Sequence, residues 1–157
     1  LACETIPSGI EARALRRLLS QRNDVRAWVS FSCRTEDQLA DGTPLVEAVR
    51  TVEDLDQVLA VGINCTPPHL ISSLIDQARS ATDKSIVVYP NSGESWNSGQ
   101  HCWAPGAGGP GLAEEAESWF RRGAKILGGC CRTGPSDIRA LREALGTRIE
   151  PKLENRR

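Results

Sequence analysis

Three cysteines lie where they could hold a metal ion together. Cys65 follows one apolar, strand-like run, and the adjacent pair Cys130 and Cys131 follows another, 65 residues further along the chain. Thiolates are preferred ligands of Zn²⁺, and a catalytic zinc site uses three protein ligands and leaves the fourth position open. Tertiary structure, and not a local CxxC hairpin, would have to close such a site. This spacing therefore favours a catalytic over a structural zinc.

The charge of such a site indicates the reaction that it suits. Three thiolates on Zn²⁺ leave a net charge of about −1, and a thiol that binds as the fourth ligand loses its proton at neutral pH. The bound sulfur stays nucleophilic, which suits an in-line attack on an activated methyl group. Hydrolysis is disfavoured, because the negative charge weakens the metal as a Lewis acid toward water.

The cysteines also have a simpler interpretation. A cysteine after a strand, such as Cys65, is most often a small buried apolar residue, although packing explains the Gly128-Gly129-Cys130-Cys131 run less well. The two glycines would give the backbone the freedom that adjacent ligands need. A disulfide scaffold is disfavoured, because a bond between neighbouring cysteines would be strained. Metal binding and packing both stay open on spacing alone, and no role is assigned to Cys3, Cys33 or Cys102.

Strand-like and helix-like runs alternate about five times along the chain. The expected strands are residues 1–4, 25–31, 59–64, 85–89 and 124–127, and the expected helices are 8–18, 43–52, 53–58, 67–78, 112–122 and 135–145. The strands are short and almost continuously apolar, as in a parallel sheet covered on both faces. This alternation predicts βα units and a parallel sheet.

Local signals place the first two helices more closely. Ser8 and Glu11 form a capping-box pattern at the start of the first helix. Thr43 is expected to be the N-cap of the second helix, with Pro44 at its first position. The expected apolar stripe of the first helix is Ile10, Ala14, Leu15 and Leu18.

Five βα units could form an open doubly wound sheet or an arc of a (β/α)8 barrel. The barrel is favoured because chemically interesting residues follow several different strands, at the rim where TIM barrels carry their active sites. An open sheet would usually show a glycine-rich phosphate loop early in the chain, and the sequence has none there. We therefore expect an α/β fold that is a partial TIM barrel, about the last five βα units. The rim residues are Glu4, Ser32, Cys65, Asn91, Cys130 and Cys131.

Charge and hydropathy disfavour several classes of protein. The chain has 19 Lys and Arg against 20 Asp and Glu, for a net charge of −1, so neither nucleic acid nor a membrane surface is an expected partner. No apolar run approaches the roughly 20 residues of a membrane helix, and no signal peptide is evident. The expectation is a soluble cytoplasmic protein.

Five motifs, in order, resemble those of the homocysteine S-methyltransferase family over about residues 1–145. The resemblance implies a (β/α)8 barrel with one catalytic Zn²⁺ held by Cys65, Cys130 and Cys131. The metal would bind homocysteine as a thiolate, which accepts a methyl group to become methionine; no catalytic side chain is implied beyond the metal site. The motifs are Glu4-Thr5-Ile6-Pro7, Ser30-Phe31-Ser32, Gly62-Ile63-Asn64-Cys65-Thr66, Tyr89-Pro90-Asn91-Ser92-Gly93-Glu94 and Gly128-Gly129-Cys130-Cys131-Arg132-Thr133.

The resemblance also implies substrate contacts and a methyl donor. Glu4 matches the family glutamate that binds the amino group of homocysteine, and Asn91 matches a position near the metal. The motifs most resemble the S-methylmethionine branch of plants and bacteria. The expected donor is therefore a sulfonium, S-methylmethionine or S-adenosylmethionine, with betaine or methyltetrahydrofolate as alternatives.

The family's barrel begins well before this sequence does. We therefore expect residues 1–146 to be the C-terminal part of a homocysteine-binding barrel domain and residues 147–157 to be a polar tail. An open barrel edge exposes unpaired backbone groups, which predicts self-association or a separate N-terminal half as partner. The alternative function is a non-catalytic zinc-binding or thiol-redox domain, an inactive barrel fragment.

Three further residues have two interpretations each. Trp96 and Trp103 lie in a long glycine-rich segment, 92–111, that is expected to be irregular. Their rings could attract a sulfonium cation or could anchor a surface loop. Arg132 could neutralise a substrate carboxylate, or could pair with a surface acid.

Overall fold

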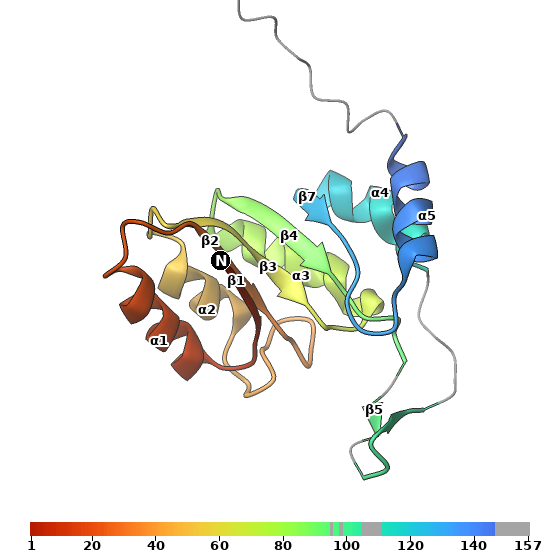
Figure 1. The fold of residues 1–157 in the computed structure, drawn as a ribbon, viewed down its shortest axis with the longest axis horizontal. Coiled ribbons are helices and arrows are strands. Elements are labelled where there is room, and N and C mark those ends of the chain that lie inside the picture. Colours follow the sequence, from red (N-terminus) through yellow and green to blue (C-terminus); the bar gives the residue numbers. More distant parts are fainter. Residues whose placement is uncertain (95, 98, 105–110, 147–157) are drawn as a thin grey trace, which may run out of the picture.

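The computed structural model describes residues 1–94, 96–97, 99–104 and 111–146, and a five-stranded parallel sheet is its main feature (Figure 1). The expected polar tail, 147–157, lies outside the described residues. The strands pair in chain order: β1 (Ala2–Ile6), β2 (Ala27–Phe31), β3 (Val58–Asn64), β4 (Ser85–Tyr89) and β7 (Ala124–Leu127). The helices are α1 (Gly9–Leu19), α2 (Leu45–Val52), α3 (Pro68–Ala81), α4 (Leu112–Arg122) and α5 (Pro135–Leu145).

The helices line one face of the sheet, as in the wall of a barrel. Crossovers between neighbouring parallel strands are right-handed, and a strand order that never reverses therefore keeps the connecting helices on one side (Figure 1). A doubly wound sheet would reverse its order and carry helices on both faces. The parallel α/β prediction is confirmed, and the five strands form an arc, with β1 and β7 as its two edges.

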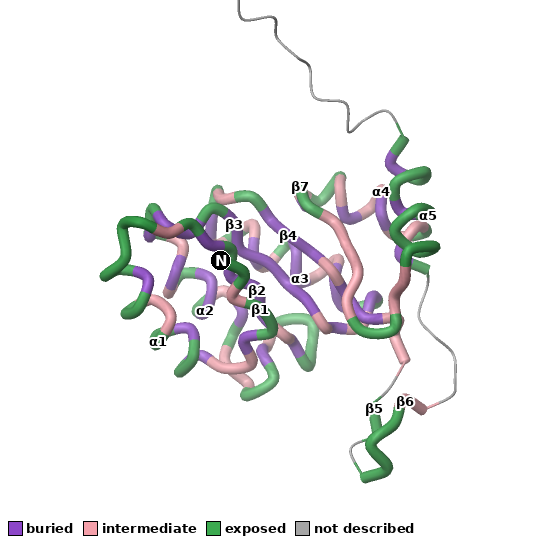
Figure 2. Tube along the Cα trace, viewed as in Figure 1, coloured by how far each residue is buried: buried purple, intermediate pink, exposed green. Residues whose placement is uncertain are grey.

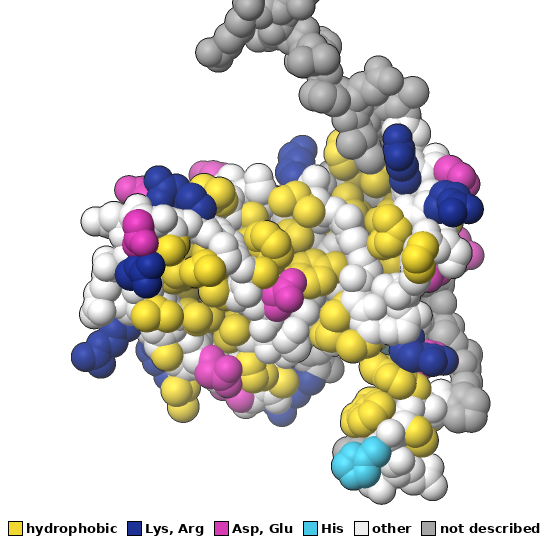
Figure 3. All heavy atoms as spheres, viewed as in Figure 1, with side chains coloured by type: hydrophobic (Ala, Val, Ile, Leu, Met, Phe, Trp, Pro, Cys, Tyr) yellow, Lys and Arg dark blue, Asp and Glu magenta, His cyan; other side chains and the backbone are white. Residues whose placement is uncertain are grey.

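The core lies between this sheet and the helices. Strand residues that face the helices are fully buried, and Figure 2 shows that the central strands are more deeply buried than the two edges. On the opposite face, Trp28 and Ile126 are 38% and 51% exposed. Figure 3 shows hydrophobic side chains gathered across this face, which we call the open face. The buried strand residues include Val29, Phe31, Val61, Ile63, Ile86 and Val88.

Helix α1 is rotated relative to the sequence prediction. Ala12 and Leu19 are buried and Leu15 packs partly buried against the core, whereas Ile10 and Leu18 are 70% and 56% exposed, so the predicted stripe is confirmed at Leu15 and is wrong at the other positions. Apolar residues occupy both faces of this helix, and tertiary contacts decide between them. Arg16 donates hydrogen bonds from α1 to the Thr51 carbonyl oxygen and to the Asp54 carboxylate, which connect this helix to the end of α2.

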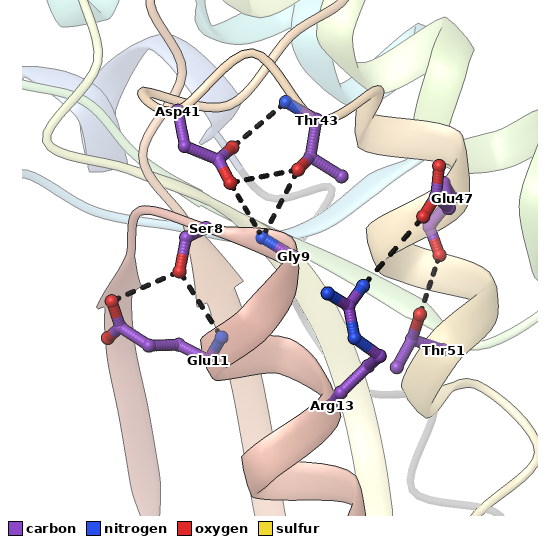
Figure 4. A network of polar contacts seen from close by, with 8 residues as sticks. All are labelled: Ser8, Gly9, Glu11, Arg13, Asp41, Thr43, Glu47 and Thr51. Carbon is purple, nitrogen blue, oxygen red and sulfur yellow. Dashed lines mark hydrogen bonds and ion pairs between the residues drawn. The ribbon is translucent and has the colours of Figure 1, made fainter.

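The loop before α2 caps α1 instead of α2 (Figure 4). The predicted N-cap Ser8 is confirmed, since its Oγ accepts a hydrogen bond from the Glu11 backbone N–H at 3.2 Å. Thr43 was expected to cap α2, but the N-cap there is Pro44. The Asp41 carboxylate and the Thr43 hydroxyl both accept from the Gly9 N–H, at 3.2 and 3.3 Å. They therefore satisfy one of the free donors at the start of α1.

Two other predictions differ from the structure. Residues 53–57 form turns that lead into β3, where a short helix was expected. The described part of segment 92–111 contains an antiparallel hairpin, β5 (Trp96–Asn97) with β6 (Cys102–Trp103). Among the described residues, no helix has the length and apolar composition that crossing a membrane requires.

Gly62 in β3 allows a close approach of β3 and β4. A Cβ atom at this position would lie 1.7 Å from the Val87 carbonyl oxygen, well inside van der Waals contact. Because the obstructing atom belongs to the backbone of a central strand, no side-chain rotation relieves the clash. The spacing of the two strands that carry Cys65 and Asn91 at their ends therefore depends on this glycine.

We predict that Gly62→Ala lowers the free energy of unfolding by about 3 kcal/mol, the upper range for overpacking a core. Urea unfolding followed by tryptophan fluorescence measures the change. The matched control is Gly111→Ala, because a Cβ there meets nothing closer than 3.7 Å and the expected change is within about 0.5 kcal/mol. Equal stabilities for the two variants would contradict this account of β3.

Candidate metal centre

The three cysteines meet at the carboxyl end of the sheet. Cys65 directly follows β3, and Cys130 and Cys131 follow β7, with β4 between these two strands. The Sγ atom of Cys65 lies 2.6 Å from that of Cys130 and 3.4 Å from that of Cys131. All three sulfur atoms fall within 4.8 Å of one another, which makes them a group that could hold one metal ion.

The end of β4 connects the two cysteine loops through its backbone. The Tyr89 carbonyl oxygen accepts a hydrogen bond from the Cys65 N–H at 3.3 Å, and the Pro90 carbonyl oxygen accepts from the Cys130 N–H at 2.8 Å. Two further bonds, Ser92 N–H to the Cys131 carbonyl and Asn91 N–H to the Thr66 carbonyl, continue this pattern. The positions of the sulfur atoms are thus set by backbone pairing.

This donor set fits Zn²⁺. Three thiolates with an open fourth position form a familiar zinc site, and Zn–S bonds of about 2.3 Å in a tetrahedron place the sulfur atoms roughly 3.8 Å apart. The Cys65–Cys131 separation of 3.4 Å is close to this value, and the Cys65–Cys130 separation of 2.6 Å is shorter. The sulfur atoms of Cys65 and Cys130 would have to move apart by about 1 Å on metal binding.

Left-handed backbone at non-glycine residues surrounds the cluster. Cys65 has φ 47°, Arg132 has φ 65°, and Thr5 at the end of β1 has φ 59°. Each such residue costs on the order of 1–3 kcal/mol, and strain of this kind collects at functional sites. Cys65 therefore leaves the strand direction at once, which turns its side chain toward the β7 loop.

The two glycines before the cysteine pair do not act as predicted. Neither Gly128 nor Gly129 adopts a positive φ, and the tight turn of this loop places Arg132 in the left-handed region instead. Gly129 is required for space, because a Cβ there would lie 2.3 Å from Thr133 Oγ1. That hydroxyl donates to the Cys130 carbonyl oxygen at 2.7 Å and closes the turn.

Asn64 supports the cluster from the side, a function that the sequence did not indicate. Its side chain is buried and exchanges two hydrogen bonds with Thr5: it donates to Thr5 Oγ1 at 2.7 Å and accepts from the Thr5 N–H at 2.9 Å. Its amide nitrogen also lies 3.9 Å from Cys130 Sγ. The one available signal was a polar residue at the end of an otherwise apolar strand.

Cys65 and Cys33 have similarly raised pKa values, for partly different reasons. Burial, together with hydrogen bonds with Cys130 and Cys131, raises the pKa of Cys65 to about 12, so a nearby cation is needed for the Cys65 thiol to act as a thiolate. Burial alone raises the pKa of Cys33 to about 12 and also raises that of Cys3. Cys33 lies in the core and Cys102 in the exposed hairpin.

The two predicted substrate contacts come from different strands, Asn91 from the loop after β4, between the two cysteine loops, and Glu4 from β1 at the edge of the sheet. Asn91 is buried in the loop after β4, and its amide oxygen accepts from the Gly93 N–H at 2.9 Å. Glu4 is on β1, exposed on the open face and beside the Tyr89 hydroxyl. Asn91 and the cysteines thus lie at the carboxyl ends of their strands, whereas Glu4, which was expected to follow its strand, is in the middle of β1 because that strand continues to Ile6.

Arg132 pairs with an acid, one of the two interpretations given above. Its Nε and NH2 groups donate to the two Glu94 carboxylate oxygens at 2.7 and 3.2 Å. This ion pair lowers the pKa of Glu94 and ties the β7 loop to the β4 loop.

The tryptophan pair lies on the hairpin. Trp96 and Trp103 pack edge to face with their ring centroids 5.4 Å apart. Figure 1 shows the hairpin set apart from the sheet, beyond the carboxyl ends of β4 and β7. This packing supports their interpretation as loop anchors.

Comparison with known proteins finds relatives along nearly the whole chain. The family model described as homocysteine S-methyltransferase matches residues 1–145. The chain is 41% identical over 141 residues to homocysteine S-methyltransferase YbgG of Bacillus subtilis, a match that covers 90% of this chain and 45% of that protein. It is 40% identical over 152 residues to homocysteine S-methyltransferase 2 of Arabidopsis thaliana, covering 94% and 45%.

A solved structure is also similar to this chain in both sequence and fold. The metallated form of the homocysteine methyltransferase MmuM from Escherichia coli superposes with a TM-score of 0.75 at 39% identity. This match covers 90% of the present chain and 43% of MmuM. The chain thus spans about half the length of the relatives it matches.

We predict that Asn64→Ala lowers zinc affinity at least about tenfold, since side chains that orient metal ligands typically contribute 10- to 100-fold. Competition with a chromophoric chelator measures the affinity, and circular dichroism checks the fold. Asn23→Ala serves as a control, because Asn23 is exposed and bonds Gln57 far from the cysteines. Unchanged zinc affinity in folded Asn64→Ala would contradict the supporting function of Asn64.

Proposed function

Because this chain belongs to the homocysteine S-methyltransferase family, we propose that it forms the zinc-binding part of an enzyme that methylates homocysteine. The methyl donor is a sulfonium, S-methylmethionine or S-adenosylmethionine, and the product is methionine. The single observation that carries the proposal is the convergence of three cysteine sulfur atoms within 4.8 Å at the carboxyl end of the sheet.

Different residues of the site bind the two ends of the substrate. Cys65, Cys130 and Cys131 hold Zn²⁺, which when bound lowers the pKa of the homocysteine thiol so that it reacts as a thiolate. The Glu4 carboxylate accepts a charge-assisted hydrogen bond from the ammonium group of the substrate. Asn91 lies next to the Cys65 loop through its backbone bond to Thr66.

The transfer itself requires positioning more than acid–base chemistry. The substrate sulfur donates an electron pair to the methyl carbon of the donor, and the bond between that carbon and the sulfonium sulfur breaks. The positive charge of the sulfonium is lost as its sulfur becomes a neutral thioether. No proton moves in this step, so the thiol ligands and the Glu4 carboxylate act by binding and orienting the substrate.

A thiol-redox function is the second candidate, and one distance favours it. The Sγ atoms of Cys65 and Cys130 are 2.6 Å apart, closer than a tetrahedral metal site requires. In a thiol-redox protein, oxidation would convert the Cys65 and Cys130 thiols into a disulfide, and the protein would not respond to homocysteine. The two functions therefore separate on metal content and on the response to substrate.

We predict about one zinc per chain in the purified protein, lost in Cys65→Ser and in Cys130→Ser because a three-ligand site does not tolerate the loss of a thiolate. Elemental analysis measures the metal. Cys102→Ser is the matched control, since Cys102 is exposed on the hairpin and its loss should leave zinc unchanged. Full zinc content in Cys65→Ser would rule out this ligand set.

With Co²⁺ in place of zinc, we predict that homocysteine shifts the visible spectrum, because its sulfur enters the fourth position. Methyl transfer is then assayed with S-methylmethionine, S-adenosylmethionine, betaine and methyltetrahydrofolate in turn. The expected result is activity with one of the first two. A spectrum that homocysteine does not change, together with failure of all four donors, would refute the enzyme proposal and leave the redox function.

A further inference from the structure

A second cluster of polar side chains lies on the open face of the sheet, below the cysteines. At its centre is the hydroxyl of Tyr89, the last residue of β4. This oxygen accepts a hydrogen bond from Trp28 Nε1 at 3.2 Å and is hydrogen-bonded to the Ser30 hydroxyl. It also interacts with the Glu4 carboxylate. Strands β1, β2 and β4 thus each contribute to one network.

The direction of these hydrogen bonds follows from the chemistry of the groups. The indole N–H of Trp28 can only donate, and an ionised Glu4 carboxylate can only accept. The Tyr89 hydroxyl has a single proton, which must therefore point to Glu4. The Ser30 hydroxyl then donates to the Tyr89 oxygen, and the chain of bonds runs from Trp28 and Ser30 through Tyr89 to the carboxylate.

Tyr89 keeps its proton under all physiological conditions. Burial and the neighbouring Glu4 raise the pKa of its hydroxyl to about 12, although the bonds from Ser30 and Trp28 act in the opposite direction.

Glu4 lies where the pairing of its strand is irregular. It is exposed on β1, at the edge of the sheet, and the pairing of β1 with β2 is irregular between Cys3 and Ile6. The next residue, Thr5, is in the left-handed region with φ 59°. A carboxylate on an irregular edge strand gains a defined position only from side-chain contacts.

The same tyrosine also touches the cysteine cluster through its backbone. Its carbonyl oxygen accepts from the Cys65 N–H at 3.3 Å, and Asn64 is its partner in the β3–β4 register. One rigid aromatic residue therefore connects the loop that carries a sulfur ligand with the carboxylate on β1.

We propose that Tyr89 is a positioning residue that holds the Glu4 carboxylate for the ammonium group of the incoming thiol, and that it thereby selects amino-acid thiols over thiols without an amino group. This inference rests on the proposed function, in which a thiol enters the fourth metal position. Within that function it assigns substrate selectivity to a side chain that touches neither the metal nor the reacting sulfur.

The test compares two thiols that differ in the ammonium group alone: homocysteine and 4-mercaptobutyrate. Each is titrated into the cobalt-loaded protein, and the visible spectrum reports binding of its sulfur. In Tyr89→Phe the ring remains and the hydroxyl is lost, so we expect homocysteine to bind about tenfold more weakly, as for loss of a hydrogen bond to a charged group. The affinity for 4-mercaptobutyrate should change less than about twofold.

Two more variants test the chain of bonds. Trp28→Phe removes the indole donor behind Tyr89 and should weaken homocysteine binding in the same direction, by a smaller factor. In Glu4→Gln, addition of Tyr89→Phe should cause little further loss, because the hydroxyl acts through the carboxylate.

Each outcome of the titration supports or contradicts either the inference or the proposed function. Equal weakening of both thiols in Tyr89→Phe would mean that the residue only supports the metal loop and would overturn the inference, as would unchanged binding of both. A parent protein that binds cobalt but neither thiol would refute the proposed function itself. Selective loss of homocysteine binding with cobalt content unchanged supports the inference.

Discussion

The backbone pairing at the carboxyl end of β4 is the constraint on which the site depends. Residues 89–92 form hydrogen bonds with the loop after β3 on one side and with the loop after β7 on the other. Neither loop contains enough apolar surface to fix itself. Because β4 lies between them in the sheet, its register determines how far apart Cys65 and Cys130 lie. The close approach of β3 and β4 at Gly62 belongs to the same arrangement.

Elements with strong local signals could be predicted from the sequence. The bounds of β4, α4, β7 and α5 agree with those expected, since each has an unbroken apolar pattern between clear turn or cap residues. Contributions from distant parts of the chain were missed. Thr43 caps α1 because the loop before α2 folds back onto it, and Arg16 on α1 hydrogen-bonds Thr51, 35 residues further along the chain. No local pattern contains either contact.

In the site, too, some features could be predicted from the sequence and others could not. Residue types and strand ends indicated that Cys65, Cys130 and Cys131 would meet, and the structure brings their sulfur atoms together. The parts played by Asn64 and Tyr89 could not be predicted, because each depends on a neighbour in another strand. Asn64 meets Thr5 across β1 and β3, and Tyr89 meets Trp28 across β2 and β4. The order of the strands in the sheet must be known before these contacts can be predicted.

The strict chain order of the strands has a consequence for how the protein is made. Each βα unit packs on the one synthesised just before it, so the sheet can grow in step with translation, one unit at a time. The cysteine cluster is different, because its parts come from the third and the last strands of the sheet. The ribosome must synthesise β7 and the loop after it before Cys130 and Cys131 exist. Until then, Cys65 is the one cluster cysteine that the growing chain carries. The proposed metal site is therefore completed only late in biosynthesis, once the last described strand of the sheet is in place.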